Sequence, residues 1–185
     1  IFLPGVTGIH IRRILYKKKF RSCGKNLIVD VGVIIEGFEF ISIGDNVTID
    51  RFTQISTTTD IKGDVKIENN HFYKGDVAGL SIGNGVHIAQ FCYIAAHAGI
   101  EIGDNCGFSS GVKIYSLTNV PNDHKDKSKI ISIMPLGNPY APYLFSPIVF
   151  GSNVWIALDS IILPGTYVGK DSFAVSNSLL MGDFP

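Results

Sequence analysis

Residues 150–169 read FGSNVWIALDSIILPGTYVG, and this stretch repeats with a period of six. Large apolar residues, here called anchors, recur at every sixth position, and the pattern continues beyond the stretch: Phe150, Ile156, Ile162, Val168, Ala174 and Leu180. The same step occurs earlier in the chain: Ile43, Ile49, Ile55; Ile82, Ile88, Ile94; Ile102, Phe108, Ile114. A period of six matches neither a helix nor a single strand, which repeat every 3.6 and every 2 residues. It predicts short straight segments joined by sharp corners.

A second position in each hexad supports this interpretation. The residue four places after the anchor is small or β-branched in all fourteen hexads from Ile43 to Ala174. Three segments make one coil, and successive coils stack as parallel strands about 4.8 Å apart. Cys92 and Cys106 occupy the small position, so we interpret them as core residues rather than as catalytic or metal-binding ones. A weaker pair of anchors, Ile28 and Ile34, predicts one further turn of the coil.

Composition limits the classes of function. The chain has 185 residues, of which 45% are hydrophobic, and 16 basic residues balance 16 acidic ones. A zero net charge disfavours nucleic-acid binding, which needs a basic footprint. Three cysteines cannot form a disulfide framework, so we expect a reducing, cytoplasmic compartment.

The basic charge is concentrated at the start of the chain. Seven of the 16 basic residues precede the first acidic residue, Asp30: Arg12, Arg13, Lys17, Lys18, Lys19, Arg21 and Lys25. We expect residues 1–26 to form a basic amphipathic segment with a helix over residues 9–20. This helix either contacts an anionic membrane surface through residues 9–21 or caps the end of the main body, and the two roles are compatible.

Two stretches interrupt the hexads, and we expect them to form loops at residues 68–80 and 115–147. The second stretch is rich in proline, tyrosine and lysine, which favours an ordered, extruded arm. Loops of this length in a compact domain are usually either functional or disordered. We therefore expect the arm to contact a substrate or a partner.

Residues 27–185, and above all 147–157 and 161–169, resemble the hexapeptide-repeat acyltransferase family. The segments Leu3-Pro4-Gly5, Arg12-Arg13 and Cys23-Gly24-Lys25-Asn26 resemble the lead-in of bacterial polysaccharide O-acetyltransferases within that family. The resemblance implies an all-β fold, a left-handed parallel β-helix. It also implies a homotrimer, and acetyl-CoA as donor in the groove between neighbouring subunits, with no metal. The expected activity is O-acetylation of a sugar hydroxyl of a surface polysaccharide or its precursor; the alternative acceptor is an amino sugar, giving N-acetylation.

Direct acyl transfer needs a base with a pKa near neutrality, which favours histidine. In the sugar acetyltransferases that this chain resembles, the catalytic histidine follows a segment similar to residues 115–118, where this chain has Asn119. Asparagine cannot accept a proton near pH 7. The base is therefore His97 at the edge of a coil or His124 in the arm, with Asp123 or Glu101 as an orienting carboxylate, or else this chain has lost the base and Asn119 only holds a substrate hydroxyl or orients a water.

The resemblance also implies where the donor binds. The pantetheine arm of acetyl-CoA is expected to run along the outer groove, by residues that include the corner pair Pro164-Gly165: Trp155, Ala157, Pro164, Gly165 and Gly169. Family members often have glycine where Ala157 stands, so the added methyl group narrows this groove.

Three other classes of protein share this repeat. A zinc-dependent carbonic anhydrase needs three converging histidines, and His71, His87 and His97 do not occupy equivalent positions of successive coils. A non-catalytic β-helix would have no use for the long arm. A sugar nucleotidyltransferase needs a nucleotide-binding domain that a chain of this length cannot hold.

Overall fold

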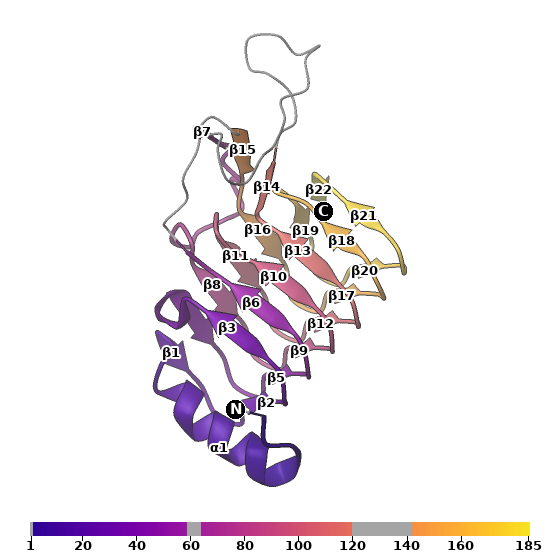
Figure 1. Ribbon diagram of the computed structural model, residues 1–185. Helices are drawn as coiled ribbons and strands as arrows, with labels where there is room; N and C mark the ends of the chain where they lie inside the picture. Colours follow the sequence, from indigo (N-terminus) through magenta and orange to yellow (C-terminus); the bar gives the residue numbers. More distant parts are fainter. Residues whose placement is uncertain (1, 59–63, 120–141) are drawn as a thin grey trace.

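The computed structural model describes residues 2–58, 64–119 and 142–185. Short strands stack into a three-sided prism, with α1 (Gly5–Lys17) at its base and the last coils at the opposite end (Figure 1). The stacked coils predicted from the hexads are confirmed, and they wind with the left hand that the family resemblance implies.

Each side of the prism is one parallel sheet, here called a face. Face 1 contains β1 (Ser22–Cys23), β4 (Ile41–Ile43), β8 (Leu80–Ile82), β11 (Ile100–Ile102), β16 (Ile148–Phe150), β19 (Tyr167–Val168) and β22 (Asp183–Phe184). Face 2 contains β2 (Ile28–Val29), β5 (Thr48–Ile49), β9 (His87–Ile88), β12 (Gly107–Phe108), β17 (Trp155–Ile156) and β20 (Phe173–Ala174). Face 3 contains β3 (Ile34–Glu36), β6 (Gln54–Ser56), β10 (Tyr93–Ala95), β13 (Lys113–Tyr115), β18 (Ile161–Ile162) and β21 (Leu179–Leu180).

The anchors fill the interior of the prism, as the period of six predicts. Ile49, Ile88 and Ile156 are fully buried and lie in register on face 2 with Phe108 between the last two. Cys92 and Cys106 are also buried, which confirms their interpretation as core residues. Burial raises the pKa of the Cys92 thiol to about 11, so this thiol stays protonated and unreactive.

The first coil begins earlier than predicted, and its register differs by one residue. β1 at Ser22–Cys23 already pairs with β4, so the prism includes part of the expected N-terminal segment. Val29, and not Ile28, is the buried anchor, because Val29 pairs with Ile49. Ile28 is 39% exposed and Ile34 is 49% exposed on the outside of the prism. In each of the pairs Ile28-Val29 and Ile34-Ile35 both residues are apolar, so the sequence alone does not show which of the two points inward.

The N-terminal helix caps the base of the prism. Arg12 of α1 is buried, and its Nε donates a hydrogen bond to the Val29 carbonyl oxygen at 2.8 Å. Tyr16 of α1 packs edge-on against Phe38, with ring centroids 5.3 Å apart; Phe38 belongs to a short 3-10 helix, η1 (Phe38–Phe40). The expected role of the helix as a cap is therefore confirmed. Within the described residues, no helix has the length and the apolar character that crossing a bilayer requires.

Both insertions leave the prism at the same corner, where face 3 turns into face 1; we call it the third corner. The first insertion lies between β6 and β8 and includes β7 (Asp64–Ile67); the second lies between β13 and β16 and includes β14 (Leu117–Asn119) and β15 (Pro142–Phe145). These strands form a small sheet in the order β14-β15-β7 beside the prism (Figure 1). The first insertion is wider than the predicted loop at residues 68–80, because Ile67 is 70% exposed and is no anchor.

Candidate functional site

The third corner carries His97, one of the two histidines proposed as the base. The corner residues 96–99 connect β10 to β11, in the coil between the two insertions. Gly99 has a φ of +109°, and a Cβ there would lie 2.8 Å from a ring carbon of Tyr73, which belongs to the first insertion. The first insertion is therefore packed directly onto the corner that holds His97.

The environment of His97 keeps its imidazole neutral. Burial lowers the pKa of His97, while a hydrogen bond with the Thr58 backbone and the charge of Glu36 act in the opposite direction. Its Nδ1 atom is buried and has no hydrogen-bond partner among the described residues. A neutral imidazole can accept a proton, as a base must, but the Nδ1 atom of His97 is closed off from solvent in the single chain.

A serine after β13 stabilises the same corner. The Ser116 hydroxyl is buried, donates a hydrogen bond to the Ala95 carbonyl oxygen at 2.9 Å, and accepts one from the Ala98 N–H at 2.9 Å. Because both bonds go to the backbone on either side of His97, Ser116 fixes the path of that turn. Ser116 thus holds the corner in shape.

The other predicted catalytic residues lie in the second insertion. Asn119 is the last residue of β14 and is exposed, paired opposite Tyr143 of β15. Asp123 and His124 lie outside the described residues, so their roles stay predictions. Glu101 lies on β11 and points outward on face 1, where it lines a separate pocket with Tyr73.

The residues predicted to bind the donor lie on different sides of one prism. Trp155 is on face 2, and Ala157 follows it at the corner between faces 2 and 3. Pro164 and Gly165 lie at the third corner, and Gly169 lies at the corner between faces 1 and 2. A single chain therefore does not bring all five residues together, and their joint role stays a prediction.

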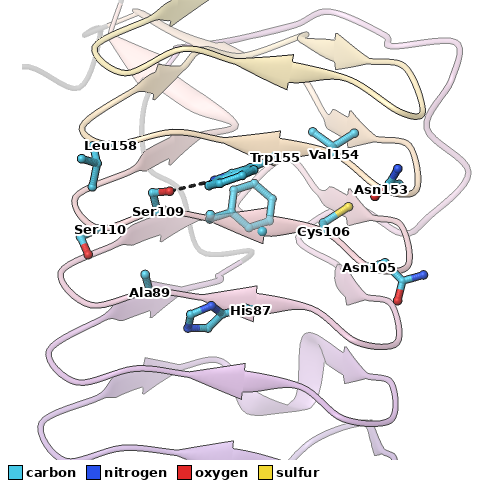
Figure 2. A pocket seen from close by; sticks show the side chains of 12 residues that line it. His87, Ala89, Asn105, Cys106, Ser109, Ser110, Asn153, Val154, Trp155 and Leu158 are labelled. Carbon is cyan, nitrogen blue, oxygen red and sulfur yellow. Dashed lines mark hydrogen bonds between the residues drawn. The ribbon is translucent and has the colours of Figure 1, made fainter.

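A groove runs over face 2 and has a volume of about 490 Å³. Figure 2 shows its wall, which is formed by β9, β12 and β17. Gly107 is its floor, because it stands in register between His87 and Trp155 and has no side chain. Trp155 is 58% exposed, and its indole N–H donates a hydrogen bond to the Ser109 hydroxyl at 2.9 Å. The indole ring meets the Phe173 ring edge-on, with the ring centroids 5.5 Å apart.

A histidine–carboxylate pair borders this groove, and the sequence analysis did not identify it. His87 Nε2 lies 2.9 Å from Oδ2 of Asp50, and the His87 side chain is 57% exposed. The sequence places His87 outward, because it precedes the anchor Ile88. It does not show that Asp50 lies beside His87, because the first insertion separates them along the chain. Asp50 follows β5, and His87 begins the neighbouring strand β9. A clue to the pair in the sequence is that Asp50 directly follows the anchor Ile49 in the coil just before the first insertion.

The described residues do not gather a metal site. Among residues 2–58, 64–119 and 142–185, no three His, Cys, Asp or Glu side chains lie close enough to hold a metal ion. His71 contacts Phe72 with a tilted ring in the first insertion, His87 borders the face 2 groove, and His97 lies at the third corner. These three histidines therefore do not converge within one chain.

Comparison with known proteins gives relatives of one kind. No family model matches the chain. It is 29% identical over 150 residues to the dTDP-4-amino-4,6-dideoxy-D-glucose acyltransferase of Escherichia coli, a match that covers 78% of this chain and 64% of the relative. The chain therefore spans less than two thirds of the length of the curated relative it matches.

Solved structures share the fold. A variant of AntD, an N-acyltransferase from Bacillus cereus solved with dTDP and coenzyme A, superposes with a TM-score of 0.72 at 24% identity, over 94% of this chain and 80% of that chain. A maltose O-acetyltransferase from Clostridium difficile 630 gives a TM-score of 0.55 at 20% identity, over 100% of this chain and 71% of that chain. A hexapeptide-repeat acetyltransferase from Vibrio cholerae gives a TM-score of 0.51 at 18% identity, over 96% of this chain and 72% of that chain.

These matches agree with the resemblance seen in the hexads and in residues 147–169. The chain thus has the left-handed β-helix fold, and the proteins reported above that it is similar to are acyltransferases.

Proposed function

We propose that the protein is an acyl-CoA-dependent acyltransferase whose acceptor is the amino group of a nucleotide-linked sugar. The relative from Escherichia coli acts on a dTDP-linked amino sugar, and AntD is an N-acyltransferase seen with dTDP and coenzyme A. The structural observation that carries the proposal is the groove on face 2, which has a volume of about 490 Å³ and is bordered by His87 and Trp155. N-acylation thus replaces sugar O-acetylation as the first choice, because these relatives favour an amino acceptor.

We further propose that three copies assemble and that the donor lies between them. The five predicted donor residues are spread over three sides of one prism, so two neighbouring prisms are needed to enclose one acyl-CoA molecule. Such an arrangement sets the third corner of one copy against face 2 of the next. Light scattering on the purified protein should give about 60 kDa, three times the chain mass of 20.1 kDa. A mass of one chain at working concentration would refute this arrangement.

The activity is tested by thiol release from acetyl-CoA in the presence of dTDP-4-amino-4,6-dideoxyglucose, with maltose as the hydroxyl acceptor for comparison. The product distinguishes the two reactions, because hydroxylamine cleaves an ester and leaves an amide intact. We expect an amide product with the amino sugar. No thiol release with either acceptor would refute an acyltransferase acting on these sugars, and release with maltose alone would restore the O-acetyltransferase interpretation.

The sequence-derived candidates for the base are tested in the same assay with His97→Ala and His124→Ala. A histidine base contributes on the order of 100- to 10,000-fold to the rate. If neither substitution lowers turnover, neither residue is the base, and the fold is unaffected by that result.

A peripheral membrane contact through residues 9–21 is the last part of the proposal. Although Arg12 points into the prism, Ile11, Ile14 and Leu15 are exposed on α1, and Lys17–Lys19 are exposed at its end. Exposed apolar residues next to lysines suit the anionic inner surface of the cytoplasmic membrane. Sedimentation with vesicles tests this: we expect binding to phosphatidylglycerol vesicles and none to phosphatidylcholine vesicles. Equal recovery in the two supernatants would refute the contact.

A further inference from the structure

His87 and Asp50 form a pair whose geometry fits proton transfer. β9 presents His87 outward because Ile88 points into the core. Asp50 follows β5, the neighbouring strand, and its Oδ2 lies 2.9 Å from His87 Nε2. A carboxylate can only accept a hydrogen bond, so Nε2 carries the proton in the neutral ring. Nδ1 is then the nitrogen with a free lone pair, and it belongs to a side chain that is 57% exposed.

The groove beside this pair has the shape and the lining of a sugar site. His87, Gly107 and Trp155 are in register on three successive strands, so the flanking backbones are roughly 9.6 Å apart, twice the strand spacing. Gly107 has no side chain to fill the space beside the imidazole, and the indole of Trp155 leans over it, with Cδ1 3.8 Å from where a Cβ would lie, so the acceptor ring is placed between this indole and the imidazole. Among the residues that line the groove, only His87 and the buried Cys106 have titratable side chains. The other lining residues are small, polar or apolar: Ala89, Asn105, Gly107, Phe108, Ser109, Ser110, Asn153, Val154, Trp155 and Leu158. Trp155 is held in place by Ser109 and Phe173.

We propose that the amino-sugar ring of the acceptor binds in this groove, against Trp155, and that His87 accepts the proton of the attacking amine. This inference rests on the proposed function and names the acceptor subsite within it. Asp50 is a positioning residue, because it fixes the tautomer of His87 and stabilises the imidazolium. Trp155 borders the acceptor ring on the side that leads to Ala157, and the thioester of acyl-CoA has to enter this same groove to meet the amine.

The chemistry balances without any further reactant. The lone pair of the neutral amine attacks the thioester carbonyl carbon, and a C–N bond forms. The C–S bond breaks, and the electron pair leaves with the sulfur of coenzyme A. The amine proton moves to Nδ1 of His87 and then to the thiolate or to solvent, which returns the ring to its neutral form.

The third corner offers a less suitable base. His97 Nδ1 is buried, and the Thr58 backbone hydrogen-bonds the ring, so the imidazole is engaged within its own chain. His87 is exposed, has a carboxylate partner and borders a groove of sufficient volume. His97 is therefore placed to shape the corner, and His87 is placed to touch a ligand.

The test compares His87→Asn with His10→Asn, a change at an exposed histidine on α1, in the thiol-release assay. We expect His87→Asn to lower kcat by 100- to 10,000-fold with the KM for acetyl-CoA changed less than about threefold. His10→Asn should match the wild type. Asp50→Asn should lower kcat less and shift the pH profile, and the nitrogen shifts of His87 in NMR spectra should report loss of the single tautomer. A His87→Asn enzyme that keeps a third or more of the wild-type kcat would overturn the inference.

Two further measurements keep the outcome unambiguous. Circular dichroism melts verify folding of each variant, and His87→Gln replaces His87→Asn if the latter unfolds. If the wild type transfers no acyl group, the proposed function fails and the role as base fails with it. The binding site is then decided separately by titrating the wild type with dTDP-4-amino-4,6-dideoxyglucose: NMR shifts at His87 and not at His10 support the subsite, and their absence overturns it.

Discussion

Two glycines in one coil should respond in opposite ways to the same substitution. Gly103 lies at the corner between β11 and β12, and Gly107 is the first residue of β12. A Cβ added at Gly103 would lie 2.7 Å from the backbone carbon of Gly151 and 2.7 Å from the backbone nitrogen of Ser152. A Cβ added at Gly107 would meet only Cδ1 of Trp155, at 3.8 Å, which is ordinary contact. Neither backbone has the positive φ that favours glycine.

The magnitudes follow from these contacts. Replacing glycine with alanine at a compatible position stabilises a protein by about 0.4–1 kcal/mol, because the unfolded chain loses freedom. Gly107→Ala should show this gain. Gly103→Ala has the same gain but must move backbone of the next coil, and overpacking of this kind costs about 1–3 kcal/mol. We therefore expect Gly107→Ala to be more stable than Gly103→Ala by about 1–3 kcal/mol.

Urea unfolding followed by circular dichroism measures this difference. The two variants add the same atoms to the same coil, so each is the control for the other. Equal midpoints, or a less stable Gly107→Ala, would refute the conclusion that a methyl group at Gly107 fits without displacing its neighbours. Gly107→Leu extends the test to function, because its side chain would occupy the groove between His87 and Trp155: the fold should persist while the KM for the acceptor rises at least tenfold.

Three further outcomes are expected. Burial lowers the pKa of His97 below its ordinary value of 6.5, so protonation of this side chain favours the unfolded chain. The free energy of unfolding should therefore be at its full value above pH 6.5 and fall as the pH drops below 6.5. In a plot of urea midpoint against pH, His97→Gln should flatten this fall. Phe108→Ala should cost about 3–5 kcal/mol, since Phe108 is buried and meets Phe150 edge-on at 5.1 Å, and a loss below 1 kcal/mol in urea unfolding would contradict the packing. Cys92 and Cys106 should resist a thiol reagent until urea unfolds the chain, because burial raises both pKa values, and rapid labelling of the native protein would contradict their placement.

The sequence predicts the prism well because one physical requirement repeats along the chain. Every coil needs a large residue inside each face and a small one near each corner. Ile88 and Val112 can therefore be assigned to the interior without any knowledge of distant contacts. The prediction fails where this requirement is ambiguous. Two adjacent apolar residues hid the inward position of Val29, and Ile67 has the spacing of an anchor although it lies outside the prism.

The site is harder to predict because its residues are distant in sequence. The sequence identifies His97 at a coil edge and Trp155 on a face, and the structure agrees with both placements. It does not predict that Nδ1 of His97 is shielded from solvent, because His97 is packed against the start of the first insertion, where the Thr58 backbone hydrogen-bonds the ring. It also does not pair His87 with Asp50, because the length of the insertion decides which residues become neighbours on face 2.

The cap formed by α1 also determines how copies of this protein can meet. The outermost strands of a stacked prism carry backbone groups that could pair with another molecule and build a filament. Arg12 takes up the carbonyl oxygen of Val29 on the outermost strand of face 2, and the helix lies across that end (Figure 1). Head-to-tail pairing through the outermost strand of face 2 is thereby hindered.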